Sequence, residues 1–513
     1  MFSLRAVATV GGMTLISRLL GFVREILIAG ILGTGPMAEA FIVAMRLPNL
    51  LRQMFAEGAF SAAFIPIFTR HLTEEGEAGA QKFAEQVLSI MLVLLLALTL
   101  VAELTMPWLI QIFAPGFDEL PEKFAATVLF TSITFPYILF MSFCSLQGGM
   151  LNGLQKFAHT AAAPIILNVI LVTTLWLVEG DDFFVAQTLS WAVMGAGFVQ
   201  FLFLTGACHK AGMILRLTWP RLTPEVKRLG RLMLPGLIGA SATQVNLVVS
   251  TILASLHPGA ISYIYYADRL YQLPLALIGT AIGVVLLPSL TKALRGEEPG
   301  VAMRMHNRAL ELGLLLSLPS MVGLMVASLP IVTTLYQRGA FTADDSAAVS
   351  LALIIMAAGL PAYIGLKALT VGFLAREDTG TPFRFAVVSV AVNIAISATL
   401  TPTYGFVGVA TGMMVAAWVN AALLTWTLHR RGFLVFDARF RRFLPRQAIA
   451  CVGLGLVTWL AAELAWPGGT AANSQRVIAT VIIIGAGVVA FAALALLLRV
   501  TSLGDLRMLR RTR

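Results

Sequence analysis

Ionisable side chains occur inside stretches of this sequence that are otherwise apolar enough to cross a membrane. The run from about residue 6 to 32 carries Arg18, Arg24 and Glu25. A charge at the centre of a membrane helix costs roughly 2.5–3.5 kcal/mol on insertion scales, and such residues usually face a bundle interior or a water-filled cavity. Guanidinium groups bind phosphate well, because they offer two parallel donors to its oxygens. These arginines therefore predict a site for a phosphate-bearing ligand.

Further charges lie in later apolar segments of the chain. We expect the ligand to be bound by Arg18, Arg24, Arg52 and Arg269. We expect supporting charges at Glu25, Glu39, Arg46, Glu57, Asp268 and Lys367. Two interpretations stay open, namely ion pairs that tie helices together and a cationic cavity that binds an anion. Basic residues outnumber acids near the middle of these segments, which favours the cavity.

The spacing of the charges indicates which of them share a helix face. Arg18 and Glu25 are seven residues apart, as are Glu39 and Arg46, so each pair lies on one side of its helix. This spacing favours Arg18, or a residue of a neighbouring helix, as the partner of Glu25.

Arg18 and Arg24 are six residues apart, which separates them by about 120° around an ideal helix. Both reach one cavity only if the helix bends or lines a wide wall. Gly21 and Pro48 are hinge candidates, since proline removes a backbone hydrogen bond.

The composition requires a membrane environment for these segments. Of 513 residues, 58% are hydrophobic and 12% are charged, and the mean hydropathy is +0.86. Soluble domains have about 45–50% apolar and about 25% charged residues. Long helices are expected, because lipid offers no partner for unpaired backbone groups. We predict an all-α integral membrane protein with fourteen transmembrane helices, at residues 6–32, 37–68, 84–113, 124–151, 158–178, 183–208, 229–256, 260–290, 305–337, 345–374, 383–402, 405–429, 444–466 and 475–498.

The distribution of Lys and Arg predicts the orientation. With the N-terminus in the cytoplasm, 27 of the 36 basic residues fall in inside segments, three in outside loops and six within spans. Cytoplasmic loops carry such an excess, so both termini are expected in the cytoplasm. The net charge of +10 then follows from topology, and no nucleic-acid partner is expected.

The sequence also contains an internal repeat. "FIPIFTR" (64–70) aligns with "LLPSLTK" (286–292), and the same offset, without gaps, aligns "NGLQKFAHT" (152–160) with "LAREDTGTP" (374–382). We predict two parallel six-helix repeats, residues 1–222 and 223–433, followed by two further helices and a basic tail in 434–513. Parallel repeats related by an axis along the membrane normal are a transporter architecture.

Four stretches resemble one known family. "SRLLGFVRE" (17–25), "RLPNLLRQMFAEGAFSAAFIPIF" (46–68), "YYADRLYQLPLALIGTAIGVVLLPSL" (265–290) and "FLAREDTGTPFRFA" (373–386) are similar to the MurJ lipid II flippases. These belong to the multidrug/oligosaccharidyl-lipid/polysaccharide exporter superfamily. The family's functional arginines match Arg18, Arg24, Arg52 and Arg269, and two positions that are often Asp in the family are Glu25 and Glu39 here.

The resemblance implies a function and partners. The expected activity is to move lipid II, an undecaprenyl-pyrophosphate-linked sugar-peptide, from the cytoplasmic to the periplasmic leaflet of the bacterial inner membrane by alternating access. Membrane lipids and cell-wall synthesis enzymes are the other expected partners. The last two helices would hold the lipid tail. Exporters of another lipid-linked oligosaccharide, a multidrug cation antiporter and a scaffold for cell-wall synthesis are the alternatives.

Neither a cofactor nor catalytic machinery is expected. Asn246, Asn393 and Asn420 are the polar candidates for an ion site in the second half, but asparagines in membrane helices usually bond other helices. We therefore assign no metal site, and leave coupling to the membrane potential or to a monovalent cation open. No nucleotide-binding loop or catalytic triad is found, which predicts that the protein is not an enzyme.

Overall fold

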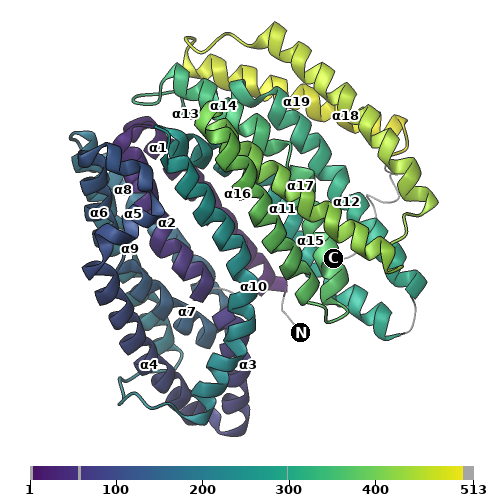
Figure 1. The fold of residues 1–513 in the computed structure, drawn as a ribbon. Coiled ribbons are helices and arrows are strands. Elements are labelled where there is room, and N and C mark those ends of the chain that lie inside the picture. Colours follow the sequence, from purple (N-terminus) through teal and green to yellow (C-terminus); the bar gives the residue numbers. More distant parts are fainter. Residues whose placement is uncertain (1–3, 56–58, 297–298, 501–513) are drawn as a thin grey trace. The chain divides into compact units, whose positions relative to one another are not determined.

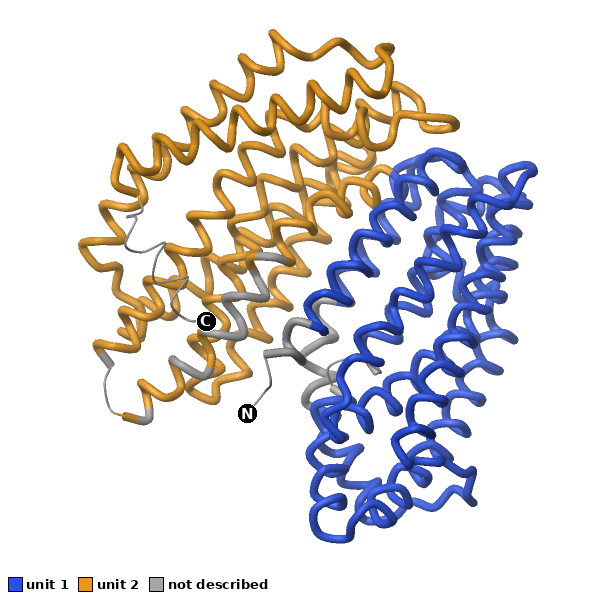
Figure 2. The backbone as a smooth tube through the Cα atoms, turned by 180° about the vertical axis from the view of Figure 1, so that it is seen from behind, with its two compact units in different colours: residues 1–262 blue, residues 263–513 orange. Residues whose placement is uncertain are grey.

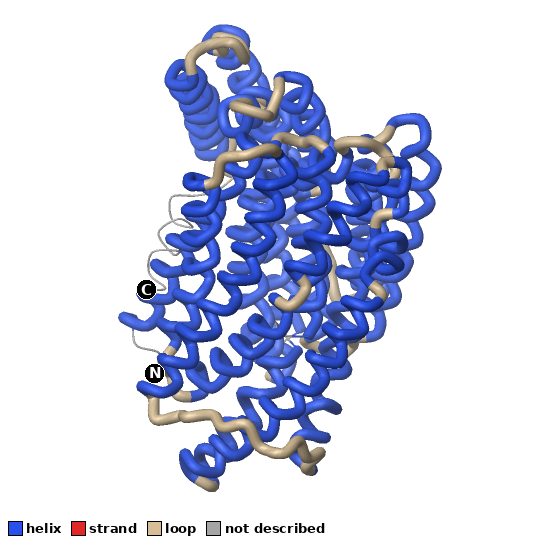
Figure 3. Tube along the Cα trace, turned by 90° about the vertical axis from the view of Figure 1, so that its left-hand side faces the viewer, coloured by secondary structure: helices blue, strands red, loops and turns tan. Residues whose placement is uncertain are grey.

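Helices account for all the regular structure that is described. The computed structural model describes residues 4–55, 59–296 and 299–500, and within these ranges the chain forms helices joined by loops and turns (Figure 3). The prediction of an all-α protein is confirmed.

The chain divides into two compact units, residues 1–262 and 263–513 (Figure 2). The first unit contains α1 (Leu4–Leu32), α2 (Pro36–Phe55), α3 (Ala59–Glu74), α4 (Gly76–Leu104), α5 (Met106–Phe113), η1 (Pro115–Glu119), α6 (Pro121–Thr134), α7 (Tyr137–Gly153), α8 (Phe157–Leu177), α9 (Asp182–Lys210) and α10 (Pro224–Ser255) (Figure 1). Helix α10 opens the predicted second repeat, yet it packs against α3 within this unit. The repeat boundaries inferred from the sequence stay a prediction.

The second unit begins inside α11 (Ala260–Arg295). Its other helices are α12 (Pro299–Val326), α13 (Ser328–Tyr336), α14 (Ala343–Ala357), α15 (Leu360–Leu374), α16 (Gly380–Tyr404), α17 (Phe406–Arg430), α18 (Ala438–Ala465) and α19 (Asn473–Leu497) (Figure 1). Helices α18 and α19 pack on each other, α18 also packs on α12, and α19 also packs on α13. They are the two helices expected outside the repeat.

Ten helical segments are long and apolar enough to cross a membrane, counted over the described residues. They correspond to ten of the fourteen predicted spans. The described residues of the other four, at 6–32, 37–68, 229–256 and 260–290, are helical except Leu256 at the end of the third. The protein is thus a multi-pass membrane protein, and the count of fourteen stays a prediction.

Several predicted spans consist of two consecutive helices. The span at 84–113 breaks after Leu104, and the one at 305–337 breaks after Val326, which is the equivalent position in the repeat alignment. The span at 84–113 resumes as α5, and the span at 345–374 resumes as α15. Each of these helices has proline as its second residue, Pro107 and Pro361, where the missing backbone N–H costs little. The breaks after Leu104 and Val326 therefore occur at equivalent positions of the two repeats. Proline stands at the start of α5 and of α15.

The local backbone reproduces the internal repeat at the loop after α7 and α15. Gln155 and Glu377, which the repeat alignment pairs, both have positive φ, at 60° and 62°. The next residue in each loop donates its N–H back to the preceding helix, from Lys156 to the Leu151 carbonyl at 2.7 Å and from Asp378 to the Phe373 carbonyl at 3.1 Å. Left-handed conformations are rare in residues other than glycine, so this agreement supports the six-helix repeats.

A second correspondence lies at the ends of α9 and α17. Gly212 and Gly432 have φ of 86° and 69°, and each donates its N–H at 3.0 Å to a histidine carbonyl, of His209 and His429. The difference in residue number between the two repeats is slightly smaller here than in the earlier helices. With it, "FVQFLFLTGACHKAG" (198–212) aligns with "WVNAALLTWTLHRRG" (418–432) without a gap. The register of the repeat therefore shifts between α15 and α17.

Candidate functional site

Arg24 of α1 is held by two oxygens from different helices. One nitrogen of its guanidinium lies 2.5 Å from a carboxylate oxygen of Glu25, and the other donates to the amide oxygen of Asn168 in α8 at 2.9 Å. The Glu25 side chain is buried, and that of Arg24 is 14% exposed. The spacing in the sequence favoured Arg18 or a neighbouring helix as the partner of Glu25. The structure shows an ion pair between Glu25 and the adjacent Arg24.

Asn168 also fixes the contact between α1 and α8. Its amide nitrogen donates to the Ser17 carbonyl at 2.9 Å, so one side chain bridges the backbone of α1 and the guanidinium of Arg24. A Cβ atom on Gly21 would lie 3.6 Å from the Asn168 amide, which is ordinary contact. Helix α1 runs through Gly21 without a break, and its role as a hinge stays a prediction. The sequence signal for Asn168 was an amide inside an apolar span.

Arg18 has a different environment from Arg24 although both lie on α1. Its side chain is exposed, as are most of the described side chains in the N-terminal half of this helix. The C-terminal half contributes buried residues such as Ile28 and Leu32 to a core with α2, α6, α8 and α9. Helix α1 therefore anchors one end in unit 1 and presents Arg18 on the other.

Helix α2 carries two more of the predicted arginines. Arg46 donates to the hydroxyl of Thr251 in α10 at 2.8 Å. Arg52 donates from two of its nitrogens to the amide oxygen of Asn49, at 2.9 and 2.7 Å. Pro48 lies inside the helix between these arginines. A hydrogen bond to a neutral oxygen orients a guanidinium but does not cancel its charge.

Glu39 sits at the opposite end of α2, in a buried ion pair that the sequence did not indicate. One carboxylate oxygen lies 2.5 Å from the ammonium of Lys123 at the start of α6, and the other accepts the backbone N–H of Ile261 at 2.9 Å. Lys123 also lies 3.6 Å from the ring centroid of Phe117. Its position directly before an apolar span suggested a loop. It is in fact 4% exposed and neutralises a glutamate that is 1% exposed.

The remaining predicted residues are spread more widely. In unit 2, the guanidinium of Arg269 stacks on the ring of Tyr265, 4.5 Å from its centroid, and Asp268 accepts a hydrogen bond from Gln272. Lys367 is exposed on α15. Glu57 lies outside the described residues. The structure thus brings Arg24 and Glu25 together, and it places Arg269 and its neighbours in a separate unit.

Asn393, one of the polar residues considered for an ion site, makes a contact typical of helix packing. The amide oxygen of Asn393 accepts the hydroxyl of Ser397 at 2.9 Å, and both side chains are fully buried. Within the described ranges, no group of three His, Cys, Asp or Glu side chains gathers as metal ligands would. The prediction that no metal is bound is not tested by this observation.

Comparisons with known proteins agree with the resemblance of the motifs. The sequence model of the family described as "Lipid II flippase MurJ" matches residues 28–474. A "Probable lipid II flippase MurJ" of Rhizobium meliloti (strain 1021) is 45% identical over 470 residues, which cover 91% of this chain and 88% of that protein.

Solved structures give the same result. A structure of "Lipid II flippase MurJ, inward closed conformation" matches with a TM-score of 0.79 at 25% identity, over 95% of this chain and 97% of that chain. An inward-facing multidrug resistance MATE family transporter of the MOP superfamily shares the fold, with a TM-score of 0.68 at 14% identity, over 83% of this chain and 98% of that chain. The chain belongs to the MurJ family of lipid II flippases.

Proposed function

We propose that this protein moves lipid II from the cytoplasmic to the periplasmic leaflet of the bacterial inner membrane. The observation that carries the proposal is the placement of Arg24 and Arg18 on one membrane helix, in a chain that belongs to the MurJ family. The substrate carries a pyrophosphate, and arginine binds phosphate oxygens in a bidentate manner.

Arg18, Arg24, Arg52 and Arg269 are the proposed pyrophosphate ligands. Arg24 is oriented in advance by Glu25 and Asn168, and Arg52 by Asn49. Groups that are already oriented lose less conformational entropy when the ligand binds. Because charge interactions are stronger in a medium of low dielectric constant, arginines within membrane helices can compensate the phosphates where water is scarce.

Alternating access is the proposed mechanism. The buried pair of Glu39 and Lys123 joins α2 to α6, and the Ile261 N–H ties the first turn of α11 to the same carboxylate. In the proposed orientation, with both termini in the cytoplasm, this cluster lies at the periplasmic end of α2. It would hold that end closed until the helices rearrange.

The drive for transport is proposed to include the membrane potential. An inside-negative potential favours outward movement of an anion by roughly 2.3 kcal/mol per charge per 100 mV. Collapse of the potential with an ionophore should therefore slow flipping in cells, while unchanged flipping would exclude this drive. Coupling to a monovalent cation would instead appear as a dependence on the cation gradient at constant potential.

Further parts of the proposal concern partners and chemistry. The protein is a transporter, and we propose that it catalyses no covalent step, needs no cofactor and binds no nucleic acid. Lipid II and the surrounding membrane lipids are its ligands, and cell-wall synthesis enzymes are proposed partners. Loss of the protein should therefore disturb peptidoglycan synthesis and cell shape.

Replacement of a depleted lipid II flippase in growing bacteria tests the proposal. The wild-type chain should restore growth, whereas Arg18→Ala, Arg24→Ala and Arg269→Ala should not. Lys82→Ala is the matched control, because Lys82 is exposed in α4 outside the arginine set. Protein levels in the membrane must be equal.

Each alternative gives another pattern. An exporter of a different lipid-linked oligosaccharide, or a multidrug antiporter, would not restore growth at all. A scaffold would restore growth with the arginine variants as well as with the wild type. Either result would refute the proposal.

A further inference from the structure

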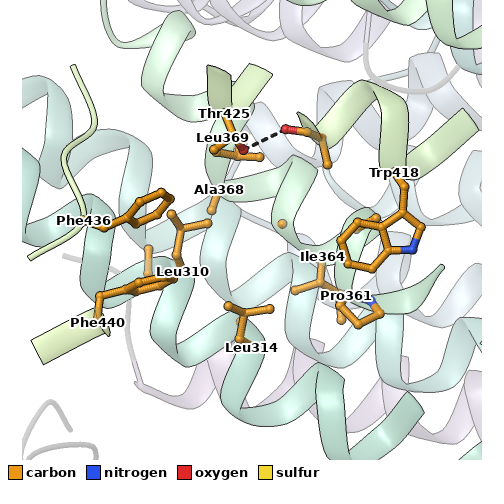
Figure 4. Close-up of a pocket in the computed structure, with 15 residues that line it drawn as sticks. Leu310, Leu314, Pro361, Ile364, Ala368, Leu369, Trp418, Thr425, Phe436 and Phe440 are labelled. Atoms are coloured by element: carbon orange, nitrogen blue, oxygen red, sulfur yellow. Dashed lines mark hydrogen bonds between the residues drawn. The ribbon is translucent and has the colours of Figure 1, made fainter. Parts of the chain in front are cut away.

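An apolar slot lies within unit 2, away from the predicted arginines. It has a volume of about 140 Å³ and is lined by α12, α15 and α17, together with Phe436 and Phe440 near the start of α18. In Figure 4, Leu310, Phe436 and Phe440 lie on one side of the slot and Trp418 and Pro361 on the other. Apolar cavities of this size stay dry and take up apolar ligands of about the size of benzene.

The slot continues into a wider hollow of about 460 Å³. Trp418, Ala421, Thr425 and Phe436 line both, and the hollow adds residues toward the C-terminal end of α17. Trp418 is 44% exposed, so the wall of the slot reaches the outer surface of the helices. Together the two spaces form an apolar path along α17 that is open to the surroundings.

In unit 1, larger side chains occupy the positions that are equivalent to the lining of the slot. In the alignment of α9 with α17, Ala421 of α17 corresponds to Phe201 of α9. In the alignment of α7 with α15, Ala362 and Gly365 of α15 correspond to Phe140 and Phe143 of α7.

These three phenylalanines pack together in unit 1. The ring centroid of Phe201 lies 6.2 Å from that of Phe140 and 5.7 Å from that of Phe143. The alignment is supported by Thr205 and Thr425, which correspond and which both bond the carbonyl four residues earlier, at 2.8 and 2.7 Å. Small residues at three aligned positions have thus left a slot in one repeat where the other has aromatic packing.

Positive charge stands at the open end of the path. Arg430 stacks on Trp426, 4.3 Å from its ring centroid, and both side chains are exposed. His429 lines the hollow, and its Nδ1 lies 3.0 Å from the Leu434 carbonyl. The neighbouring Arg431 is bound to Asp378 at 2.7 Å, whereas Arg430 lies against Trp426, which lines the hollow.

We infer that this path binds an anionic glycerophospholipid, with one acyl chain in the slot and the phosphate at Arg430. The slot lies in membrane-spanning helices, where acyl chains are the abundant apolar ligand, and it is lined by apolar residues. A guanidinium at the helix end complements a phosphate. Lipid binding here is independent of the molecule that the protein transports.

The bound lipid would support the junction between α17 and α18. Phe436 and Phe440 line the slot; Asp437 follows Phe436 directly and lies three residues before Phe440. Asp437 caps α18 by accepting the Phe440 N–H at 2.8 Å, and it forms an ion pair with Arg308 of α12. An acyl chain against both phenylalanines would therefore hold α18 on α12.

Photocrosslinking of the full chain in lipid nanodiscs tests this inference. The probes are a phosphatidylglycerol and a phosphatidylcholine, each with a diazirine on one acyl chain, and peptide mass spectrometry locates the label. Phosphatidylglycerol should label peptides of α15 and α17 around the slot. Ala421→Phe, which restores the aromatic residue of unit 1, should abolish this label, and Ala421→Leu should weaken it. Val452→Phe on the exposed face of α18 is the control for added bulk and should leave it unchanged.

The charge is tested separately, with variants of exposed basic side chains. Arg430→Gln should reduce the preference for phosphatidylglycerol over phosphatidylcholine by about fivefold, since one basic residue contributes about 1 kcal/mol at an anionic lipid surface. Lys210→Gln at the corresponding end of α9 should leave it unchanged, because the slot there is filled. Equal labelling by the two probes, label that survives Ala421→Phe, or label at the slot only from a polyprenyl phosphate probe would each overturn the inference.

Discussion

The buried ion pair between Glu39 and Lys123 allows a sharp test of how charge is held in this membrane protein. The change to make is Glu39→Gln, which keeps the shape of the side chain and an oxygen that can accept the Ile261 N–H. It removes the charge 2.5 Å from the Lys123 ammonium. The ammonium is then left buried without a counter-charge.

The size of the effect follows from this geometry. At 2.5 Å and an effective dielectric constant of about 20, the attraction between the two charges is about 7 kcal/mol, and the cost of removing both ions from water offsets part of it. Breaking a buried pair by removing one partner typically costs about 3–5 kcal/mol. We expect Glu39→Gln to lower the free energy of unfolding by that amount.

The assay is equilibrium unfolding in mixed micelles, followed by intrinsic fluorescence. The double variant Glu39→Gln with Lys123→Met should recover most of the loss, because no buried charge is left. Glu122→Gln is the matched control, since Glu122 is exposed beside Lys123, and it should change the free energy by less than about 0.5 kcal/mol. A loss below about 1 kcal/mol for Glu39→Gln, or a double variant as unstable as the sum of the single ones, would refute the reasoning.

Three other predictions concern separate contacts. Asn168→Ala should remove the hydrogen bond to Arg24, which is worth about 1.5–3 kcal/mol, and should reduce growth rescue. Asn473→Ala at the exposed start of α19 should leave growth rescue unchanged. Equal rescue by the two variants would contradict the prediction. Burial alone would raise the pKa of the Asp378 carboxyl, but hydrogen bonds from Thr381 and the ion pair with Arg431 lower it from 3.8 to about 2. The contribution of this carboxylate to the free energy of unfolding is therefore complete above about pH 4 and is lost as the pH falls through about 2. Asp378→Asn should cost about 1–2 kcal/mol at pH 7 and only a small fraction of that at pH 2, as measured by unfolding. A cost at pH 2 as large as at pH 7 would argue against the ion pair. Gly408→Ala should destabilise the packing of α16 on α17 by about 1–3 kcal/mol, because the new Cβ would lie 2.5 Å from the Thr401 backbone nitrogen. Gly195→Ala should have no such effect, because no atom lies within 4 Å of its new Cβ. Thermal unfolding of the two variants measures the difference.

The sequence alone determined the features of this protein that depend on local pattern. Runs of apolar residues predict membrane helices, because each helix satisfies its own backbone in lipid whatever its neighbours are. The alignment of 64–70 with 286–292 predicted two repeats, and the matching backbone at Gln155 and Glu377 supports them. The motifs around Arg18, Arg24 and Arg269 indicated the family, which the comparisons show.

Only the tertiary structure decided which side chains meet. Spacing along one helix places Arg18 and Glu25 on one face, but Glu25 pairs with Arg24. Lys123 is 84 residues from Glu39, and no local pattern links them. Helical periodicity sets the direction of a side chain, whereas its partner depends on which helix packs beside it. The slot in unit 2 has the same origin, because the small side chains of Ala421 and Gly365 leave a space only where α15 and α17 are brought together.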